Sequence, residues 1–274
     1  VIINDLPNQY DTYISKDAFK PTPDMPQSLI YLPLVFEGKA IGVLTVQSYK
    51  KDAYKEVDHT ILQTLASYIS VALSNSNAFE VIKEANKNIT NSIRYAQTIQ
   101  EAILPSETEM SEYLGEHFVI YRPKDIVSGD FYWSGKVLNA DGFIEKVFVA
   151  VVDCTGHGVP GAFMSMIGKT LLDEIINQHR IHDTAQILEE LNIAVKKALK
   201  QEDNINDDGM DVCLCCLEKT PEGTKVIFTG AKRPLYYSQK GNPEIQILKR
   251  DSKTNGSIQR KKRKFTKQEL ILNS

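Results

Sequence analysis

The longest regular pattern in the chain is helical. Neither glycine nor proline occurs between Asp58 and Leu104, and Pro105 follows directly. Because these two residue types most often interrupt or end a helix, the stretch predicts one helix, which at 1.5 Å per residue would be roughly 70 Å long. Such a helix is too long to be buried inside one small domain.

The second half of this helix carries an apolar stripe with a seven-residue repeat. The two registers of the stripe are Ile82, Ile89, Ala96 and Ile103, and Ala85, Ser92 and Ile99. The repeat predicts the seam of a short parallel coiled coil, and therefore a homodimer through the helix. The alternative is an amphipathic helix packed on its own domain, which the polar residues Asn86, Ser92 and Gln100 near the seam favour.

Strand-like patterns flank the helix on both sides. Residues 28 to 49 form two apolar runs joined at Glu37-Gly38-Lys39, which predicts a hairpin with glycine in the turn. After Pro105, short runs predict strands at His117–Tyr121, Lys146–Val152, Val212–Leu217, Lys225–Thr229, Pro234–Ser238 and Ile245–Leu248, and longer stretches predict helices at Gly161–Gln178 and Thr184–Gln201. Turn signals at Glu222-Gly223 and Lys240-Gly241 join neighbouring strands. This order favours an α+β sandwich with antiparallel sheets over a Rossmann-type parallel sheet.

Composition narrows the class of protein. The 274 residues suit one large or two ordinary domains, and 42% apolar residues are enough for a buried core. With 32 basic and 35 acidic side chains the formal charge is -3, which argues against a nucleic-acid binder and favours protein or small-molecule partners. The basic run Arg260–Lys264 is better interpreted as a solvated loop than as a nucleic-acid or phosphate site.

Cysteine usage and hydropathy bear on the compartment. Three of the four cysteines lie within four positions, which does not resemble a disulfide framework and favours a reducing cytoplasm. No apolar run approaches the length of a membrane span, and no signal peptide is visible. The first residue is Val1, which is consistent with a piece of a longer protein.

Two aspartates stand at the ends of strand-like runs. The run from Phe148 to Val152 ends on Asp153 and then turns through glycines, and the run Ile126–Trp133 places Asp130 directly after a glycine. Carboxylates held at strand ends suit Mg²⁺ or Mn²⁺, which take hard oxygen ligands, and the sharp turn would bring the Cys154 carbonyl near the same ion. Two ions bridged by Asp153 would activate a water toward a phosphate ester. The alternative, that Asp153 only caps a helix or turn, is equally compatible with composition.

Other chemistries are weaker. Gly168-Lys169-Thr170 lacks the earlier glycine of a phosphate-binding loop, because Phe163 stands there. Cys154 with His157 suggests a thiol nucleophile, but Pro160 stands where a cysteine phosphatase needs arginine. Cys213, Cys215 and Cys216 lack a partner motif for zinc and are better interpreted as small core residues.

Two further groups have competing interpretations. His157 could bond a substrate phosphate or hold the turn, and we favour the structural role. Asp208 and Asp211 could approach an accessory ion, but a solvated turn leading into a strand is the preferred interpretation.

Four motifs in order carry a family resemblance. They are SGDFYW, VAVVDCTGHGVPGAFMSMIG, DGMDVCLCCLE and GAKRPLYY. Together they resemble the SpoIIE/RsbU branch of the PP2C (PPM) serine/threonine phosphatases. The preceding KNITNSIRYAQTIQEAILP resembles the helical linker of bacterial signalling proteins, and residues 28 to 79 resemble the final hairpin and closing helix of a GAF sensor domain. The expected domains are the C-terminal part of a GAF domain (1–79), a helical linker (80–104) and the phosphatase domain (105–274).

The resemblance implies a fold and a chemistry. It implies an α/β/β/α sandwich in which Asp130, Asp153 and the backbone carbonyl of Cys154 bind Mn²⁺ or Mg²⁺, with two ions in a complete domain. A metal-activated water would then attack phosphoserine or phosphothreonine on a phosphorylated regulatory protein, such as an anti-sigma-factor antagonist. Gly156, His157 and Gly158 are candidate substrate or turn contacts. A complete GAF domain would add a small-molecule ligand, whose signal the helix would transmit.

The sequence also departs from the family pattern. The family continues with a strand ending in Ser/Thr-Asp-Gly and with a later aspartate, which would follow Ser274, so at least one expected metal ligand lies outside the sequence. Trp133 stands where many relatives carry an aspartate, and we expect it to pack under the sheet. A non-catalytic signalling module that binds a phosphoprotein is therefore the alternative to a phosphatase.

Overall fold

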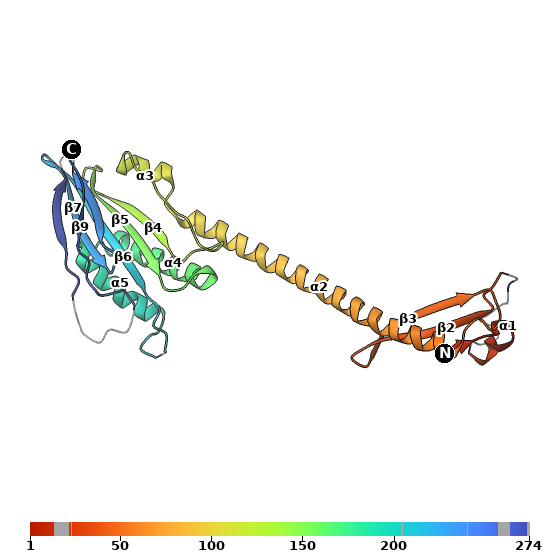
Figure 1. Ribbon diagram of the computed structural model, residues 1–274. Helices are drawn as coiled ribbons and strands as arrows, with labels where there is room; N and C mark the ends of the chain where they lie inside the picture. Colours follow the sequence, from red (N-terminus) through yellow and green to blue (C-terminus); the bar gives the residue numbers. More distant parts are fainter. Residues whose placement is uncertain (14–21, 23, 204, 240, 257–263, 273–274) are drawn as a thin grey trace. The chain divides into compact units, whose positions relative to one another are not determined.

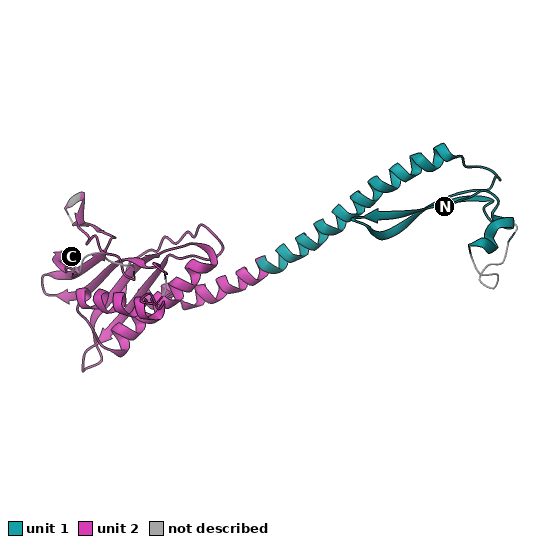
Figure 2. Ribbon diagram, turned by 90° about the horizontal axis from the view of Figure 1, so that it is seen from below, with its two compact units in different colours: residues 1–89 teal, residues 90–274 magenta. Residues whose placement is uncertain are grey.

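The computed structural model describes residues 1–13, 22, 24–203, 205–239, 241–256 and 264–272. It divides into two compact units, Val1–Ile89 and Thr90–Ser274 (Figure 2), and each is described by itself. Most of the predicted basic loop, residues 260–263, lies outside the described residues. None of the helices in the described part of the chain combines the length and the apolar character that a membrane crossing requires.

The first unit is built on an antiparallel sheet in the order β1-β2-β3. Its elements are β1 (Ile2–Ile3), α1 (Leu6–Gln9), a 3₁₀ turn (Tyr10–Thr12), β2 (Ser28–Phe36) and β3 (Lys39–Ser48). The β2–β3 hairpin is confirmed. Its loop residues Glu37 and Gly38 both have positive φ, 47° and 77°, as the tightest hairpin turns require.

The long helix α2 spans Glu56–Ile103, within two residues of the prediction. Its first half contributes Ala66 to a core with Ile30, Leu32 and Leu34 of β2. From Asn75 to Ile89 every residue is exposed, including the stripe residues Ile82 and Ile89, each 59% exposed. This part of the helix is therefore continuous and exposed along its whole length in the described part of the chain.

The second unit is an antiparallel α+β fold (Figure 1). Its elements after α2 are α3 (Glu107–Leu114), β4 (Phe131–Leu138), β5 (Ile144–Cys154), α4 (Gly158–Asp173), the π-helical turn η2 (Glu174–Gln178), α5 (Thr184–Ala198), β6 (Met210–Thr220), β7 (Gly223–Ala231), β8 (Leu235–Gln239), β9 (Asn242–Leu248) and β10 (Gln268–Leu272). Five strands form one sheet in the order β10-β7-β6-β5-β4, and β8 pairs with β9. All these pairings are antiparallel, which confirms the expected fold class.

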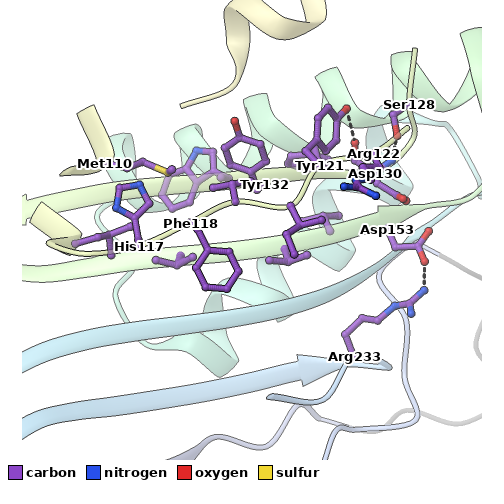
Figure 3. Close-up of a pocket in the computed structure, with 18 of the residues that line it drawn as sticks. Met110, His117, Phe118, Tyr121, Arg122, Ser128, Asp130, Tyr132, Asp153 and Arg233 are labelled. Carbon is purple, nitrogen blue, oxygen red and sulfur yellow. Dashed lines mark hydrogen bonds and ion pairs between the residues drawn. The ribbon is translucent and has the colours of Figure 1, made fainter. Parts of the chain in front are cut away.

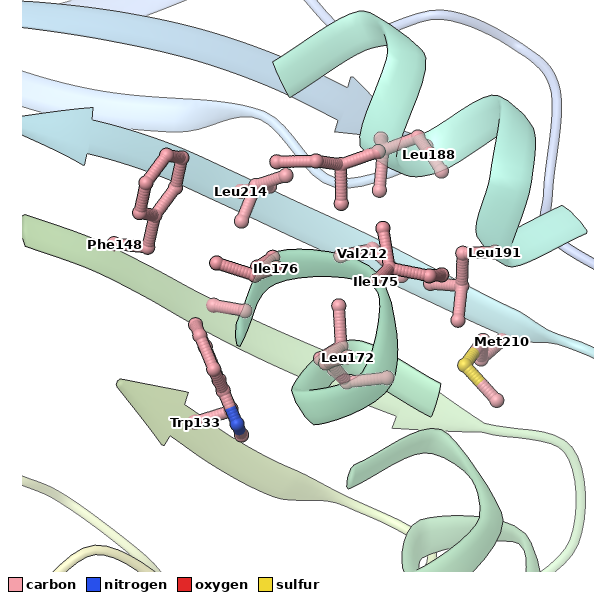
Figure 4. Packing of buried hydrophobic residues seen from close by; sticks show 14 of the residues in the cluster. Trp133, Phe148, Leu172, Ile175, Ile176, Leu188, Leu191, Met210, Val212 and Leu214 are labelled. Carbon is pink, nitrogen blue, oxygen red and sulfur yellow. The ribbon is translucent and has the colours of Figure 1, made fainter. Parts of the chain in front are cut away.

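The helices and the small sheet pack on opposite faces of the five-stranded sheet. On one face, α4, η2 and α5 bury a large core that includes Phe148, Leu172, Leu188 and Leu214 (Figure 4). On the other face, Phe228 is fully buried in a second cluster, against which Leu235 of β8 and Leu248 of β9 pack. Burial of this much apolar surface on both faces stabilises the central strands β6 and β7.

One strand prediction was wrong, and the strand β10 was not predicted. His117–Tyr121 is not a strand, and its Phe118 and Ile120 are 84% and 76% exposed. Its consecutive apolar and aromatic residues suit a strand, but within the described residues it has no ladder partner, and a strand requires such pairing. Conversely, β10 was not anticipated, although it pairs with β7 from Gln268 opposite Phe228 to Leu272 opposite Thr224.

Trp133 takes the packing role that we expected. Its side chain is only 2% exposed, and the indole Nε1 donates a hydrogen bond of 2.8 Å to Asp173 Oδ1 at the end of α4. A buried indole needs such a partner for its N–H group. The aromatic residue therefore joins β4 to α4.

Candidate functional site

Three aspartates reach the same edge of the five-stranded sheet. Asp130 directly precedes Phe131, whose ladder partner is Val152, and Asp153 directly follows Val152. On the other side of β5, Asp153 is the ladder partner of Asp211 in β6. Directly opposite residues of antiparallel strands place their side chains on one face. Figure 3 shows Asp130 and Asp153 at this edge, each at the end of its strand.

Close glycine packing brings the Asp130 loop against the turn after Asp153. A Cβ on Gly129 would lie 2.6 Å from the Gly156 carbonyl oxygen and 3.4 Å from that of Cys154. A Cβ on Gly161 would lie 2.8 Å from the same Gly156 oxygen and 2.9 Å from the nitrogen of Gly129. Only glycine allows backbones to approach this closely. The glycines of both motifs therefore position Asp130 beside the Cys154 carbonyl.

Hydrogen bonds with the side chains of Tyr121, Ser128 and Gln100 fix the backbone of the Asp130 loop. The Asp130 N–H donates to Ser128 Oγ at 2.9 Å, and Tyr121 Oη donates to the Asp130 carbonyl at 3.2 Å. Gln100 near the end of α2, only 4% exposed, donates through Nε2 to the Ser128 carbonyl and to Ser165 Oγ of α4, both at 2.7 Å. Its Oε1 accepts from the Ser128 N–H at 3.0 Å. One buried amide thus joins α2, the Asp130 loop and α4.

The turn after β7 presents two cations to these carboxylates. Arg233 pairs with Asp153, and Lys232 Nζ lies 3.8 Å from Asp211 Oδ1. Like charges directly opposite each other on a sheet are destabilising unless they are compensated. The two basic side chains supply that compensation for the Asp153–Asp211 pair.

The Cys154 thiol is unsuited to nucleophilic attack. Its side chain is 5% exposed, and burial, with the nearby charges of Asp130 and Asp211, raises the pKa of Cys154 to about 12. A thiol with that pKa is almost entirely protonated at neutral pH, whereas the thiolate is the reactive form. The cysteine-nucleophile alternative is therefore disfavoured, and the backbone carbonyl is what Cys154 offers to the site.

The remaining predicted residues support the turns around the site. His157 is the N-cap residue of α4, and its Nδ1 lies 2.7 Å from Asp125 Oδ2. Gly158 follows with a positive φ of 62°. Asp208 accepts from Thr155 Oγ1 at 2.8 Å and from Asn206 Nδ2 at 3.0 Å. These contacts agree with the structural interpretation of His157 and with the turn interpretation of Asp208, but Asp211 belongs to the row of aspartates.

The oxygen donors at this edge are of the type that Mg²⁺ and Mn²⁺ prefer. Asp153, Cys154 and Asp211 line a cleft of about 320 Å³, and Asp130, Asp153 and Arg233 line a larger one of about 790 Å³. Within the described residues, no three His, Cys, Asp or Glu side chains are arranged to hold an ion together. Two carboxylates and a backbone carbonyl are oxygen donors of the type that Mg²⁺ binds together with several waters. Cys216 is buried in the large core, and Cys215 is buried in the second cluster with Cys213 packed against it, which agrees with their interpretation as core residues.

Sequence reasoning missed three residues that shape the site. In the sequence, Gln100 stands out only as a polar interruption of the coiled-coil seam. Arg233 is part of the motif GAKRPLYY, with no role of its own, and Asp125 belongs to none of the motifs. A dibasic pair, Lys232-Arg233, directly after the Gly230-Ala231 end of a strand is a signal that could have drawn attention to Arg233. The partners of Gln100 and Asp125 depend on tertiary contacts that no local pattern records.

Comparisons with known proteins agree with this architecture. The family profile of the GAF domain matches residues 1–74, and that of Stage II sporulation protein E (SpoIIE) matches residues 145–254. The solved SiaA-PP2C domain of Pseudomonas aeruginosa is 34% identical over 69% of this chain and 69% of its own, with a TM-score of 0.57. The RsbU and RsbW domains of Rv1364c from Mycobacterium tuberculosis match at 18% identity, over 55% of this chain and 37% of theirs, with a TM-score of 0.39. No curated protein matches the chain. The chain therefore belongs to the SpoIIE family of PP2C-type phosphatases, and its N-terminal part matches the GAF domain.

Proposed function

We propose that this chain is a metal-dependent serine/threonine phosphatase of bacterial signalling. Its substrate is a phosphorylated regulatory protein of the anti-sigma-factor antagonist type. The observation that carries the proposal is the sheet edge at which Asp130 and Asp153 meet beside the Cys154 carbonyl. Membership of the SpoIIE family supports the same reaction.

In this proposal the residues at the sheet edge have two roles, metal binding and positioning of a metal ligand. Asp130, Asp153 and the Cys154 carbonyl would hold Mn²⁺ or Mg²⁺, which when bound supplies an activated water for attack on a phosphate ester. Ser128, through its bond to the Asp130 N–H, keeps that carboxylate in place. Phosphate release from a phosphoserine peptide with Mn²⁺ tests the reaction. Release that chelation stops is expected, and a chain that binds Mn²⁺ yet releases nothing would contradict it.

One observation favours a second function, a non-catalytic module that binds a phosphoprotein. The Asp153 carboxylate is already paired with Arg233, and no third side-chain ligand converges on it among the described residues. Such a module would bind the phosphorylated partner without any need for Mn²⁺. Calorimetry with Mn²⁺ separates the two functions, because retained partner affinity without metal binding would favour the module.

The long helix is the proposed route of regulation, and Gln100 is where it reaches the site. We expect Gln100→Ala to lower the free energy of unfolding by about 1–3 kcal/mol, because it leaves the buried Ser128 backbone groups without their partner. Mn²⁺ affinity should fall with it, since Ser128 anchors Asp130. Denaturant unfolding and calorimetry measure both effects. Gln97→Ala is the matched control, because the Gln97 amide donates to Glu101 Oε1 of the same helix at 2.8 Å. Equal effects of the two variants would contradict the coupling.

The exposed apolar stripe of α2 supports a homodimer. Ile82 and Ile89 are exposed in the described fold, and the same helix of a second copy of the chain would bury them. We expect Ile89→Asp to shift the chain from dimer to monomer in sedimentation, whereas Lys87→Asp, on the opposite helix face, should not. A wild-type chain that sediments only as monomer at high concentration would contradict the coiled coil.

A further inference from the structure

The turn that follows β7 is strained and tightly held. Lys232 has a φ of +54°, a left-handed conformation that is uncommon for a residue with a long side chain. Its N–H donates to the Asp251 carbonyl at 2.9 Å, and the Asp251 N–H donates to the Gly230 carbonyl at 2.9 Å. A Cβ on Gly230 would overlap the Arg233 carbonyl. Strain of this kind persists only where surrounding contacts enforce it, and it often marks a functional site.

This turn places two adjacent cations beside the aspartates of the sheet edge. Arg233 and Lys232 have side chains that are 47% and 44% exposed, and they pair with Asp153 and Asp211. Ion pairs this exposed add little to stability. The pairs offset the repulsion between Asp153 and Asp211, but that small gain does not account for a left-handed turn that presents both cations at one place.

The two cations approach Asp153 from different clefts. Arg233 lines the larger cleft together with Asp130 and Asp153, and Figure 3 shows its guanidinium directed at the Asp153 carboxylate. Lys232 lines the smaller cleft with Asp153 and Asp211. A group that carries negative charge and sits against Asp153 would thus meet a cation on each side.

We infer that Arg233, assisted by Lys232, binds the phosphoryl group of the substrate. The inference rests on the proposed function for the identity of that ligand. A divalent cation held by Asp153 would compete with Arg233 for that carboxylate, and the turn would keep the guanidinium beside the site. A released guanidinium offers a planar fork of donors that matches two phosphate oxygens, and Lys232 adds a point charge.

Binding of inorganic phosphate to the whole chain in the presence of Mg²⁺ tests this assignment. Phosphorus NMR or calorimetry should show that Arg233→Ala weakens phosphate binding at least tenfold. Arg233→Lys should recover only part of the loss, because it restores the charge without the fork, and Lys232→Ala should have the smaller effect. Lys225→Ala is the matched control, since Lys225 also pairs with a carboxylate, Glu269, at 2.9 Å, but on the β7–β10 side of the sheet. It should bind phosphate like the wild type, and Mg²⁺ binding to Arg233→Ala should not be weaker.

Three results would overturn the assignment. They are wild-type phosphate affinity in Arg233→Ala, no phosphate binding by the wild type, and tighter Mg²⁺ binding in Arg233→Ala without a change in phosphate affinity. The last result would make Arg233 only a counter-ion of Asp153. Phosphopeptide turnover separates this inference from the phosphatase proposal. If Arg233→Ala hydrolyses the phosphopeptide with an unchanged KM, the inference about Arg233 fails and the phosphatase proposal stands. If the wild type binds phosphate through Arg233 but hydrolyses no phosphopeptide, the phosphatase proposal fails and the inference about Arg233 stands.

Discussion

Asp153→Asn should lower kcat/KM for a phosphoserine peptide by about 1000-fold, because transition-state stabilisation by a bound metal is worth several kcal/mol. The variant removes the carboxylate that stands between Asp130 and Asp211 at the sheet edge while keeping the shape of the side chain. Steady-state phosphate release with Mn²⁺ measures the loss. Stability should change by less than about 1 kcal/mol, since the Asp153 pair with Arg233 is partly exposed.

A matched variant shows whether the loss is specific to the site. Asp141 lies in the exposed turn between β4 and β5, away from the row of aspartates, so Asp141→Asn should retain wild-type activity. If Asp153→Asn hydrolyses the peptide as fast as Asp141→Asn does, the assignment of Asp153 as a metal ligand is wrong.

Gly129→Ala should damage both the fold and the site. The new Cβ would stand 2.6 Å from the Gly156 carbonyl oxygen, so the Asp130 loop must move away from the turn that follows Asp153. Overpacking of this kind costs about 1–3 kcal/mol of stability. A displacement of about 1 Å in a catalytic group can lower the rate about 100-fold. Thermal unfolding and phosphate release measure the two effects.

Gly142→Ala separates the loss of close packing from the general effect of replacing a glycine. Gly142 has a φ of +83°, but nothing lies within 4 Å of the position its Cβ would take. We expect it to cost about 1 kcal/mol through backbone strain and to leave activity intact. Full activity in Gly129→Ala would show that the approach of the two loops does not position Asp130.

The elements that sequence patterns predicted well are those that depend on local chemistry. The helix α2 follows from a run without glycine or proline, and the β2–β3 hairpin follows from Gly38 in a turn whose two loop residues both have positive φ. The end of β5 at Cys154 follows from an apolar run that stops at Asp153. In each case the signal lies within a few residues of the structure that it determines.

The features that could not be predicted depend on which segments meet. Asp208 and Asp211 are three residues apart and alike in composition, yet only Asp211 has Asp153 as its ladder partner. The run His117–Tyr121 has the apolar and aromatic residues of a strand but no described neighbour to pair with, whereas Gln268–Leu272 forms a strand by pairing with β7. In the sequence, Gln100 only weakens a coiled-coil pattern. Its role is defined by its hydrogen bonds to Ser128 of the Asp130 loop and to Ser165 of α4, which depend on tertiary packing.

Calorimetric titration of the chain with Mn²⁺, in parallel with Asp153→Asn, tests whether a metal ion binds at the sheet edge. The proposed chemistry depends on that step. We expect saturable Mn²⁺ binding by the wild type and by Asp141→Asn, and loss of this binding in Asp153→Asn. Absence of binding by the wild type, or equal affinity in Asp153→Asn, would contradict it.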